Sequence, residues 1–252
     1  MRSKFFGIFC CFIIISIIAL AVSANNPFLR DKVTNLDKED IIRNSKVVMI
    51  VLDCSGSMVD LTKNGQSKMF AAKRVLERVL SQVDSNTLIG LRVYGSSKPA
   101  FDKTTACQDS ILLVAPGTNN RIAIINKLRE IKPSGATPIS LAMRRVIKDM
   151  EAIDSSAQKS VVLISDGIDT CGYDPCMLAN SLSDSKTKIQ FNVVGFGLGD
   201  DFNAINQLKC ISTSTEGKFY TAETAGELTE SILDGVNSYS LDVSGQLKEI
   251  KD

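Results

Sequence analysis

The chain of 252 residues contains no histidine. This absence excludes the Ser-His-Asp and Cys-His forms of nucleophilic catalysis, and it excludes zinc sites that use imidazole ligands. An excess of positive charge is also missing, because 29 Lys and Arg residues are balanced by 28 Asp and Glu residues. We therefore expect neither nucleic acid nor an anionic surface as the partner. Any functional site must be built from oxygen, thiol and backbone groups.

The amino-terminal segment has the pattern of a secretory signal peptide. Arg2 and Lys4 precede an apolar run over residues 5–22, and small residues at Ser23 and Ala24 suit cleavage after Ala24. We expect residues 1–24 to direct export to the periplasm, the extracellular space or the cell envelope. The run is long for a signal peptide, so an uncleaved membrane anchor is the alternative, and only that alternative predicts membrane association.

Five cysteines follow the predicted signal peptide: Cys54, Cys107, Cys171, Cys176 and Cys210. Disulfide bonds are allowed in an exported chain, and an odd number leaves at least one thiol unpaired or paired with another chain.

The rest of the chain is ordinary for a globular protein, with 44% hydrophobic and 23% charged residues. We expect a polar linker over 25–45, one domain over 46–237 and a tail over 238–252. Continuous apolar runs predict strands at Val47–Leu52, Leu88–Tyr94, Ile111–Val114, Val161–Ile164, Ile189–Val194 and Phe219–Tyr220. Apolar residues at helical spacing predict helices over 69–83, 122–128, 139–150, 202–208 and 228–236, with a further helix after Asp174. Strands that alternate with helices indicate an α/β fold with a doubly wound, mostly parallel sheet.

Two of the predicted strands end at an aspartate. Asp53 follows the first strand and Asp166 follows the strand at 161–165, so both carboxylates should lie at the carboxyl edge of the sheet, where open α/β sheets bind ligands. Ser55 and Ser57 should point the same way as Asp53, because side chains alternate along extended backbone. Thr137 precedes the proline that begins a helix, and its hydroxyl is expected to face the same site.

These groups suit a hard cation. The oxygen ligands carry only modest negative charge. They are one carboxylate and two hydroxyls after the first strand, together with a second carboxylate and a further hydroxyl. Such a set favours Mg²⁺, with Mn²⁺ possible. Cys54 lies between two of the proposed ligands and should point away from the metal, as a small buried thiol.

One pattern resembles the metal-ion-dependent adhesion site of von Willebrand factor type A (vWA) domains. It is Asp53-x-Ser55-x-Ser57, followed by Thr137 and then by Asp166. The resemblance covers residues 46–237 and implies a complete site in a bacterial exported or envelope protein. It implies that the serine and threonine hydroxyls and the two aspartates hold the metal, with a ligand carboxylate completing its shell. It further implies a six-stranded sheet of order 3-2-1-4-5-6, whose short third strand is antiparallel at the edge.

The strand order implied by the resemblance also bears on the disulfides. It places the segments of Cys107 and Cys210 about 14 Å apart, which argues against the pairing of Cys107 with Cys210 and Cys171 with Cys176. Two pairings remain, and we favour Cys107 with Cys176 and Cys171 with Cys210.

The function expected from this sequence is metal-dependent binding of a protein ligand that has an exposed carboxylate, with no enzymatic activity. A Mg²⁺-dependent hydrolase is one alternative, although Asp53 has no second carboxylate two residues on and no Gly-rich Walker loop occurs. A structural scaffold of the cell envelope is the other alternative.

Overall fold

The computed structural model describes residues 46–153, 157–183 and 189–238. The predicted signal peptide (1–24), the linker (25–45) and the tail beyond residue 238 lie outside these residues and remain predictions. Within the described part of the chain, no helix is long and apolar enough to cross a membrane.

Six strands form one sheet with the order β3-β2-β1-β4-β5-β6. They are β1 (Lys46–Asp53), β2 (Leu88–Tyr94), β3 (Ser110–Gly117), β4 (Gln158–Ser165), β5 (Ile189–Phe196) and β6 (Phe219–Ala222). All neighbouring pairs are parallel except β2 and β3, which are antiparallel. The predicted α/β fold and the strand order implied by the vWA resemblance are therefore confirmed.

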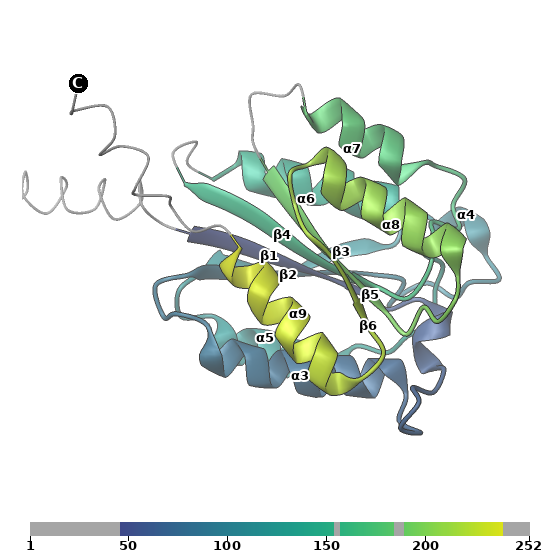
Figure 1. Ribbon diagram of the computed structural model, residues 1–252, viewed down its shortest axis with the longest axis horizontal. Helices are drawn as coiled ribbons and strands as arrows, with labels where there is room; N and C mark the ends of the chain where they lie inside the picture. Colours follow the sequence, from purple (N-terminus) through teal and green to yellow (C-terminus); the bar gives the residue numbers. More distant parts are fainter. Residues whose placement is uncertain (1–45, 154–156, 184–188, 239–252) are drawn as a thin grey trace, which may run out of the picture. The chain divides into compact units, whose positions relative to one another are not determined.

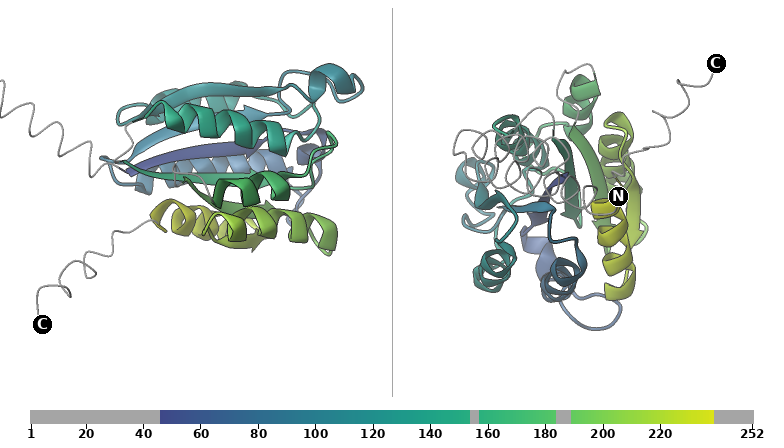
Figure 2. Two further views of the ribbon diagram at one scale, coloured as in Figure 1. Left: turned by 90° about the horizontal axis from the view of Figure 1, so that it is seen from above. Right: turned by 90° about the vertical axis from the view of Figure 1, so that its left-hand side faces the viewer.

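Helices cover both faces of this sheet (Figures 1 and 2). The helices are α3 (Lys68–Gln82), α4 (Lys103–Ala106), α5 (Arg121–Glu130), α6 (Ile139–Glu151), α7 (Pro175–Ser183), α8 (Phe202–Ser214) and α9 (Ala225–Asn237), with a short 3₁₀ helix η1 (Gly56–Val59). One hydrophobic core lies under α3, α5 and α9, and the other lies under α6, α7 and α8. The run in β1 is apolar throughout because alternate residues enter different cores: Val48 and Ile50 the first, Val47 and Met49 the second.

The sequence patterns located all six strands and the longer helices, and they missed the two shortest helices. No pattern predicted α4 or η1, each of which is only four residues long. Asp174 caps α7, because its Oδ1 accepts a hydrogen bond of 2.8 Å from the backbone N–H of Cys176. Pro138 precedes α6 at the N-cap position, one residue before the first helical turn.

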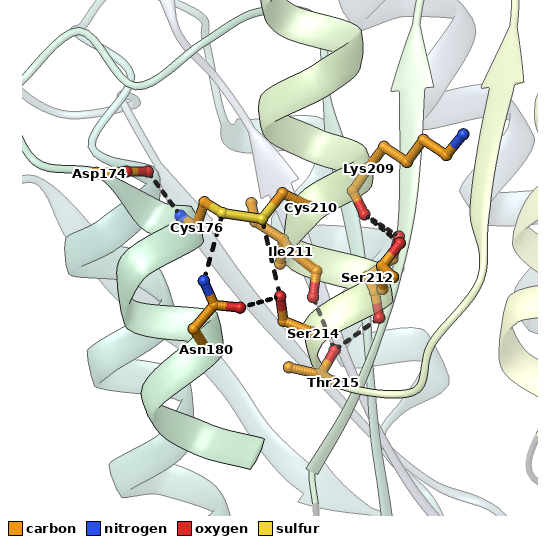
Figure 3. The surroundings of a disulfide bond; sticks show 10 residues. Asp174, Cys176, Asn180, Lys209, Cys210, Ile211, Ser212, Ser214 and Thr215 are labelled. Carbon is orange, nitrogen blue, oxygen red and sulfur yellow. Dashed lines mark hydrogen bonds between the residues drawn. A yellow bond between two sulfur atoms is a disulfide. The ribbon is translucent and has the colours of Figure 1, made fainter. Parts of the chain in front are cut away.

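Two disulfide bonds join Cys107 to Cys171 and Cys176 to Cys210, each with a Cα–Cα distance of 5.5 Å. The pairing favoured from the sequence was therefore wrong, and the other remaining pairing is present. The reason is that α7 packs alongside α8, which brings Cys176 in the first turn of α7 against Cys210 (Figure 3). The spacing of the strands alone does not reveal this helix–helix contact.

Candidate metal site

The site lies at the carboxyl edge of the sheet, on the right of Figure 1. Strand β1 pairs with β4 in parallel, with Leu52 opposite Ile164. Asp53 is the last residue of β1, and Asp166 directly follows β4. The two aspartates predicted from the sequence therefore leave neighbouring strands at the same edge.

Four of the five predicted ligands form a connected cluster. The Oγ atoms of Ser55 and Ser57 are 3.1 Å apart, and the Ser57 hydroxyl donates to Oδ1 of Asp166 at 2.8 Å. Oδ1 of Asp53 accepts a hydrogen bond of 2.7 Å from the backbone N–H of Ser55. Ser55 has an extended backbone with φ −65° and ψ 167°, so alternation places both serine side chains on the side of Asp53.

Thr137 is brought beside this cluster by its backbone. Ser55 forms an isolated parallel bridge with Gly135, and the backbone N–H of Gly56 donates to the Gly135 carbonyl at 2.9 Å. Thr137 itself is buried, and in the part of the chain that the structure describes its hydroxyl takes part in no hydrogen bond. The backbone pairing therefore holds the segment of Thr137 against Ser55 and Gly56, while no hydrogen bond among the described residues joins the Thr137 hydroxyl to the other four.

Thr170 fixes the position of Thr137. The Thr170 hydroxyl accepts a hydrogen bond of 2.9 Å from the backbone N–H of Thr137, and the Thr137 carbonyl accepts one of 3.1 Å from the backbone N–H of Thr170. The next residue, Cys171, is tied to Cys107, and its N–H donates to Asp169 at 2.7 Å. The Cys107–Cys171 disulfide therefore anchors the loop that holds Thr137.

Two glycines allow the segment 134–137 to approach the ends of β1 and β2. A Cβ atom on Gly135 would lie 2.7 Å from Cα of Gly95, which is closer than carbon atoms approach without displacement. Gly95 itself has φ +70°, in the left-handed region that favours glycine.

Asp53 is held by a buried hydrogen-bond network that the sequence analysis did not identify. Its Oδ2 lies 2.9 Å from the hydroxyl of Tyr94 and 2.7 Å from that of Ser165. Burial, followed by the negative charge of Asp166, raises the pKa of Asp53 from 3.8 to about 6. A divalent cation would instead lower the pKa of Asp53, because its positive charge favours the charged carboxylates.

Lys68 is a second group that sequence reasoning missed. Its ammonium donates to Oδ2 of Asp166 at 3.0 Å, and both side chains are buried. A lysine in the first turn of a helix resembles a surface residue in sequence, so no pattern pointed to it.

The donor set fits a hard cation. It combines the carboxylates of Asp53 and Asp166 with the hydroxyls of Ser55, Ser57 and Thr137, all oxygen donors. Nowhere in the described ranges do three or more Cys, Asp or Glu residues gather as in a carboxylate-rich or thiolate metal site. The thiol of Cys54 is buried and its Sγ lies 3.7 Å from the carbonyl of Leu52. Burial raises the pKa of this thiol, so a thiolate ligand is disfavoured.

Comparison with known proteins gives a consistent family match. The model of the von Willebrand factor type A domain family matches residues 48–234. The uncharacterized protein YwmC of Bacillus subtilis (strain 168) is 30% identical over 179 residues, which are 70% of this chain and 77% of YwmC.

Two solved structures share the fold at low sequence identity. The pilus adhesin SpaC of Lactobacillus rhamnosus GG matches with a TM-score of 0.62 and 16% identity, over 77% of this chain and 30% of SpaC. Proximal thread matrix protein 1 from the mussel byssus, solved with a zinc-occupied metal-ion-dependent adhesion site, matches with a TM-score of 0.55 and 15% identity. That match covers 77% of this chain and 46% of the mussel protein.

Proposed function

Because this chain belongs to the von Willebrand factor type A domain family, whose members typically mediate protein–protein interactions, we propose that it is a metal-dependent protein-binding module. A divalent cation is held by Asp53, Ser55, Ser57, Thr137 and Asp166, and an acidic group of the partner completes its coordination shell. The site residues fill the five positions of the family's metal-ion-dependent adhesion site.

The convergence of side chains from separate segments is the observation that carries this proposal. Ser57 and Asp166 are 109 positions apart in the chain, yet they are 2.8 Å apart at the edge of the sheet. Thr137 is buried, and its segment pairs with Ser55 through Gly135. Oxygen donors arranged in this way have few structural roles, because a fold that needed only a turn or a cap would not connect four of them from two strand ends.

We assign Mg²⁺ as the cation, with Mn²⁺ possible. The donors are carboxylate and hydroxyl oxygens, which both metals prefer. The chain has no histidine, and the described residues offer no accessible thiol to select zinc. The zinc found in the mussel relative supports a divalent cation at this position without deciding which one.

A binding role fits the site better than catalysis. Oδ2 of Asp53 already accepts from Tyr94 and Ser165, and both oxygens of Asp166 accept from Ser57 and Lys68. These contacts hold both carboxylates in fixed positions, which suits ligands of a bound cation. The two disulfides support an exported protein that meets its partner outside the cytoplasm.

The test is a thermal melt of the protein in chelator and in increasing Mg²⁺ or Mn²⁺. A cation that binds only the folded state raises the melting temperature with concentration. We expect this shift in the wild type and not in Asp53→Ala or Asp166→Ala. Asp234→Ala is the matched control, because Asp234 also pairs with a lysine, Lys218 at 3.1 Å, on the exposed surface.

The binding role requires a second measurement. Protein partners captured in Mg²⁺ should be released by chelator, and Asp166→Ala should capture none. A metal-dependent melt with no metal-dependent capture would support a structural scaffold, and a wild type without any melting shift in millimolar metal would refute the metal site.

A further inference from the structure

Lys68 is a buried cation directed at the proposed metal site. It is the first residue of α3, only 8% of its surface is exposed, and its ammonium lies 3.0 Å from Oδ2 of Asp166. The Asp166 side chain has no exposed surface. The other oxygen of Asp166 faces Ser57. Asp166 therefore connects an internal cation on one side with the ligand cluster on the other.

The fold accommodates this lysine at a cost. The amino-terminal end of a helix carries a partial positive charge, so a cation in the first turn of α3 is electrostatically unfavourable there. The side chain also needs space beside the loop after β5. A Cβ atom on Gly197 would lie 2.8 Å from Cε of Lys68, and Gly197 has φ +64°. The burial, the ion pair and the bare glycine backbone together define a slot for the lysine.

The charge of the site follows from these contacts. With both carboxyl groups ionised, Asp53 and Asp166 contribute −2, and Lys68 brings the sum to −1. A divalent cation then gives a loaded site of +1, which attracts an anionic ligand. Without the lysine the empty site would be −2 and the loaded site would be neutral.

We propose that Lys68 is an internal counter-ion that weakens metal binding and makes it cooperative with binding of a carboxylate ligand. This inference rests on the proposed function. In the absence of metal, Lys68 neutralises Asp166 and allows the domain to fold with two buried carboxyl groups. In the presence of metal, it opposes the cation by charge repulsion, and the negative charge of the ligand relieves that repulsion.

The test is calorimetric titration of the full chain with Mn²⁺, in the wild type and in Lys68→Met. We expect Lys68→Met to bind Mn²⁺ at least about tenfold more tightly, because the variant removes a positive charge that lies 3.0 Å from an oxygen of the proposed ligand Asp166 and that repels a divalent cation. Lys159→Met is the matched control: Lys159 is similarly buried, 4% exposed, near the start of β4 at the opposite edge of the sheet. Its affinity for Mn²⁺ should equal that of the wild type.

The ligand linkage is measured by repeating the titration in acetate and in chloride of equal ionic strength. Acetate should tighten Mn²⁺ binding to the wild type more than binding to Lys68→Met. If Lys68→Met does not fold without metal, Lys68→Gln retains a hydrogen-bond donor to Asp166 while it removes the charge.

The outcomes separate this inference from the proposed function. Equal Mn²⁺ affinity in the wild type and both Lys68 variants, or weaker affinity in the variants, overturns the counter-ion role and leaves the metal site intact. An equal effect of acetate in all proteins overturns the cooperativity. No Mn²⁺ binding by any of them, including the variants, refutes the proposed function itself.

Discussion

Removal of the Cys107–Cys171 disulfide is expected to weaken metal binding as well as stability, whereas removal of Cys176–Cys210 should affect stability alone. The first bond anchors the loop whose Thr170 holds the backbone of Thr137 through two hydrogen bonds. The second bond joins the first turn of α7 to α8 (Figure 3), and its sulfur atoms take part in hydrogen bonds with Asn180 and Ser214, neither of which is a site residue.

The loss of stability can be worked out from the loops that the bonds close. The sequence separations are 64 and 34 residues, and the chain-entropy relation gives about 4 kcal/mol for each at 25 °C. Because the dependence on loop length is logarithmic, the two values differ by only about 0.6 kcal/mol. The two bonds therefore provide a matched pair, nearly equal in their effect on unfolding and different in their connection to the site.

The assay uses two variants, in each of which both cysteines of one bond are replaced by serine. Urea denaturation measures the free energy of unfolding, and titration with Mn²⁺ measures the affinity of the site. We expect similar destabilisation of both variants. The Kd for Mn²⁺ should be higher only in the variant that lacks Cys107–Cys171. If both variants keep wild-type Mn²⁺ affinity, or lose it equally, the disulfide does not position Thr137 through its loop.

Three further predictions concern single groups. Tyr94→Phe removes a buried hydrogen bond to the carboxylate of Asp53 and should lower the free energy of unfolding by about 2 kcal/mol in urea denaturation, while Tyr220→Phe, which loses a bond to an exposed aspartate, should cost less than about 1 kcal/mol. Gly217→Ala should destabilise the protein by more than about 3 kcal/mol, because the new Cβ would lie 1.9 Å from a backbone oxygen of β5, whereas Gly226→Ala meets only an atom 3.8 Å away and should be tolerated in the same assay. The raised pKa of Asp53 means that the metal-free folded state binds the proton of this carboxyl group more tightly than the unfolded state does. The stability that this proton contributes is complete below about pH 4 and is lost as the pH rises through about 6. In urea denaturation with chelator, the free energy of unfolding should therefore fall by up to about 3 kcal/mol over this range, a decline that Asp53→Asn lacks and that Mg²⁺ reverses.

The sequence was sufficient for the sheet because the strands are covered on both faces. A run such as 47–52 is apolar at every position, and that pattern is typical of a parallel strand between two helical layers. The positions of Asp53 and Asp166 at one edge then followed from strand direction alone. The apolar pattern of a strand and the residue that follows its end can each be recognised from a short stretch of sequence.

The contacts around the site could not be predicted in the same way. Lys68 and Asp166 are 98 positions apart, and nothing local to α3 distinguishes a buried lysine from a solvated one. The disulfide pairing depended on the packing of α7 against α8, a tertiary contact. Thr170 and Tyr94 are common residue types whose roles arise only from what lies opposite them.

The buried thiol of Cys54 has a consequence for how this chain matures. Thiol–disulfide exchange needs an accessible thiolate, and Cys54 has neither exposure nor a pKa that favours one. Cys54 directly follows β1, at the centre of the sheet, so its thiol is no longer able to react once that strand is paired. Of the five cysteines in the described residues, oxidation after the central strands assemble therefore has four to pair, whereas earlier oxidation would have all five and could trap a wrong bond.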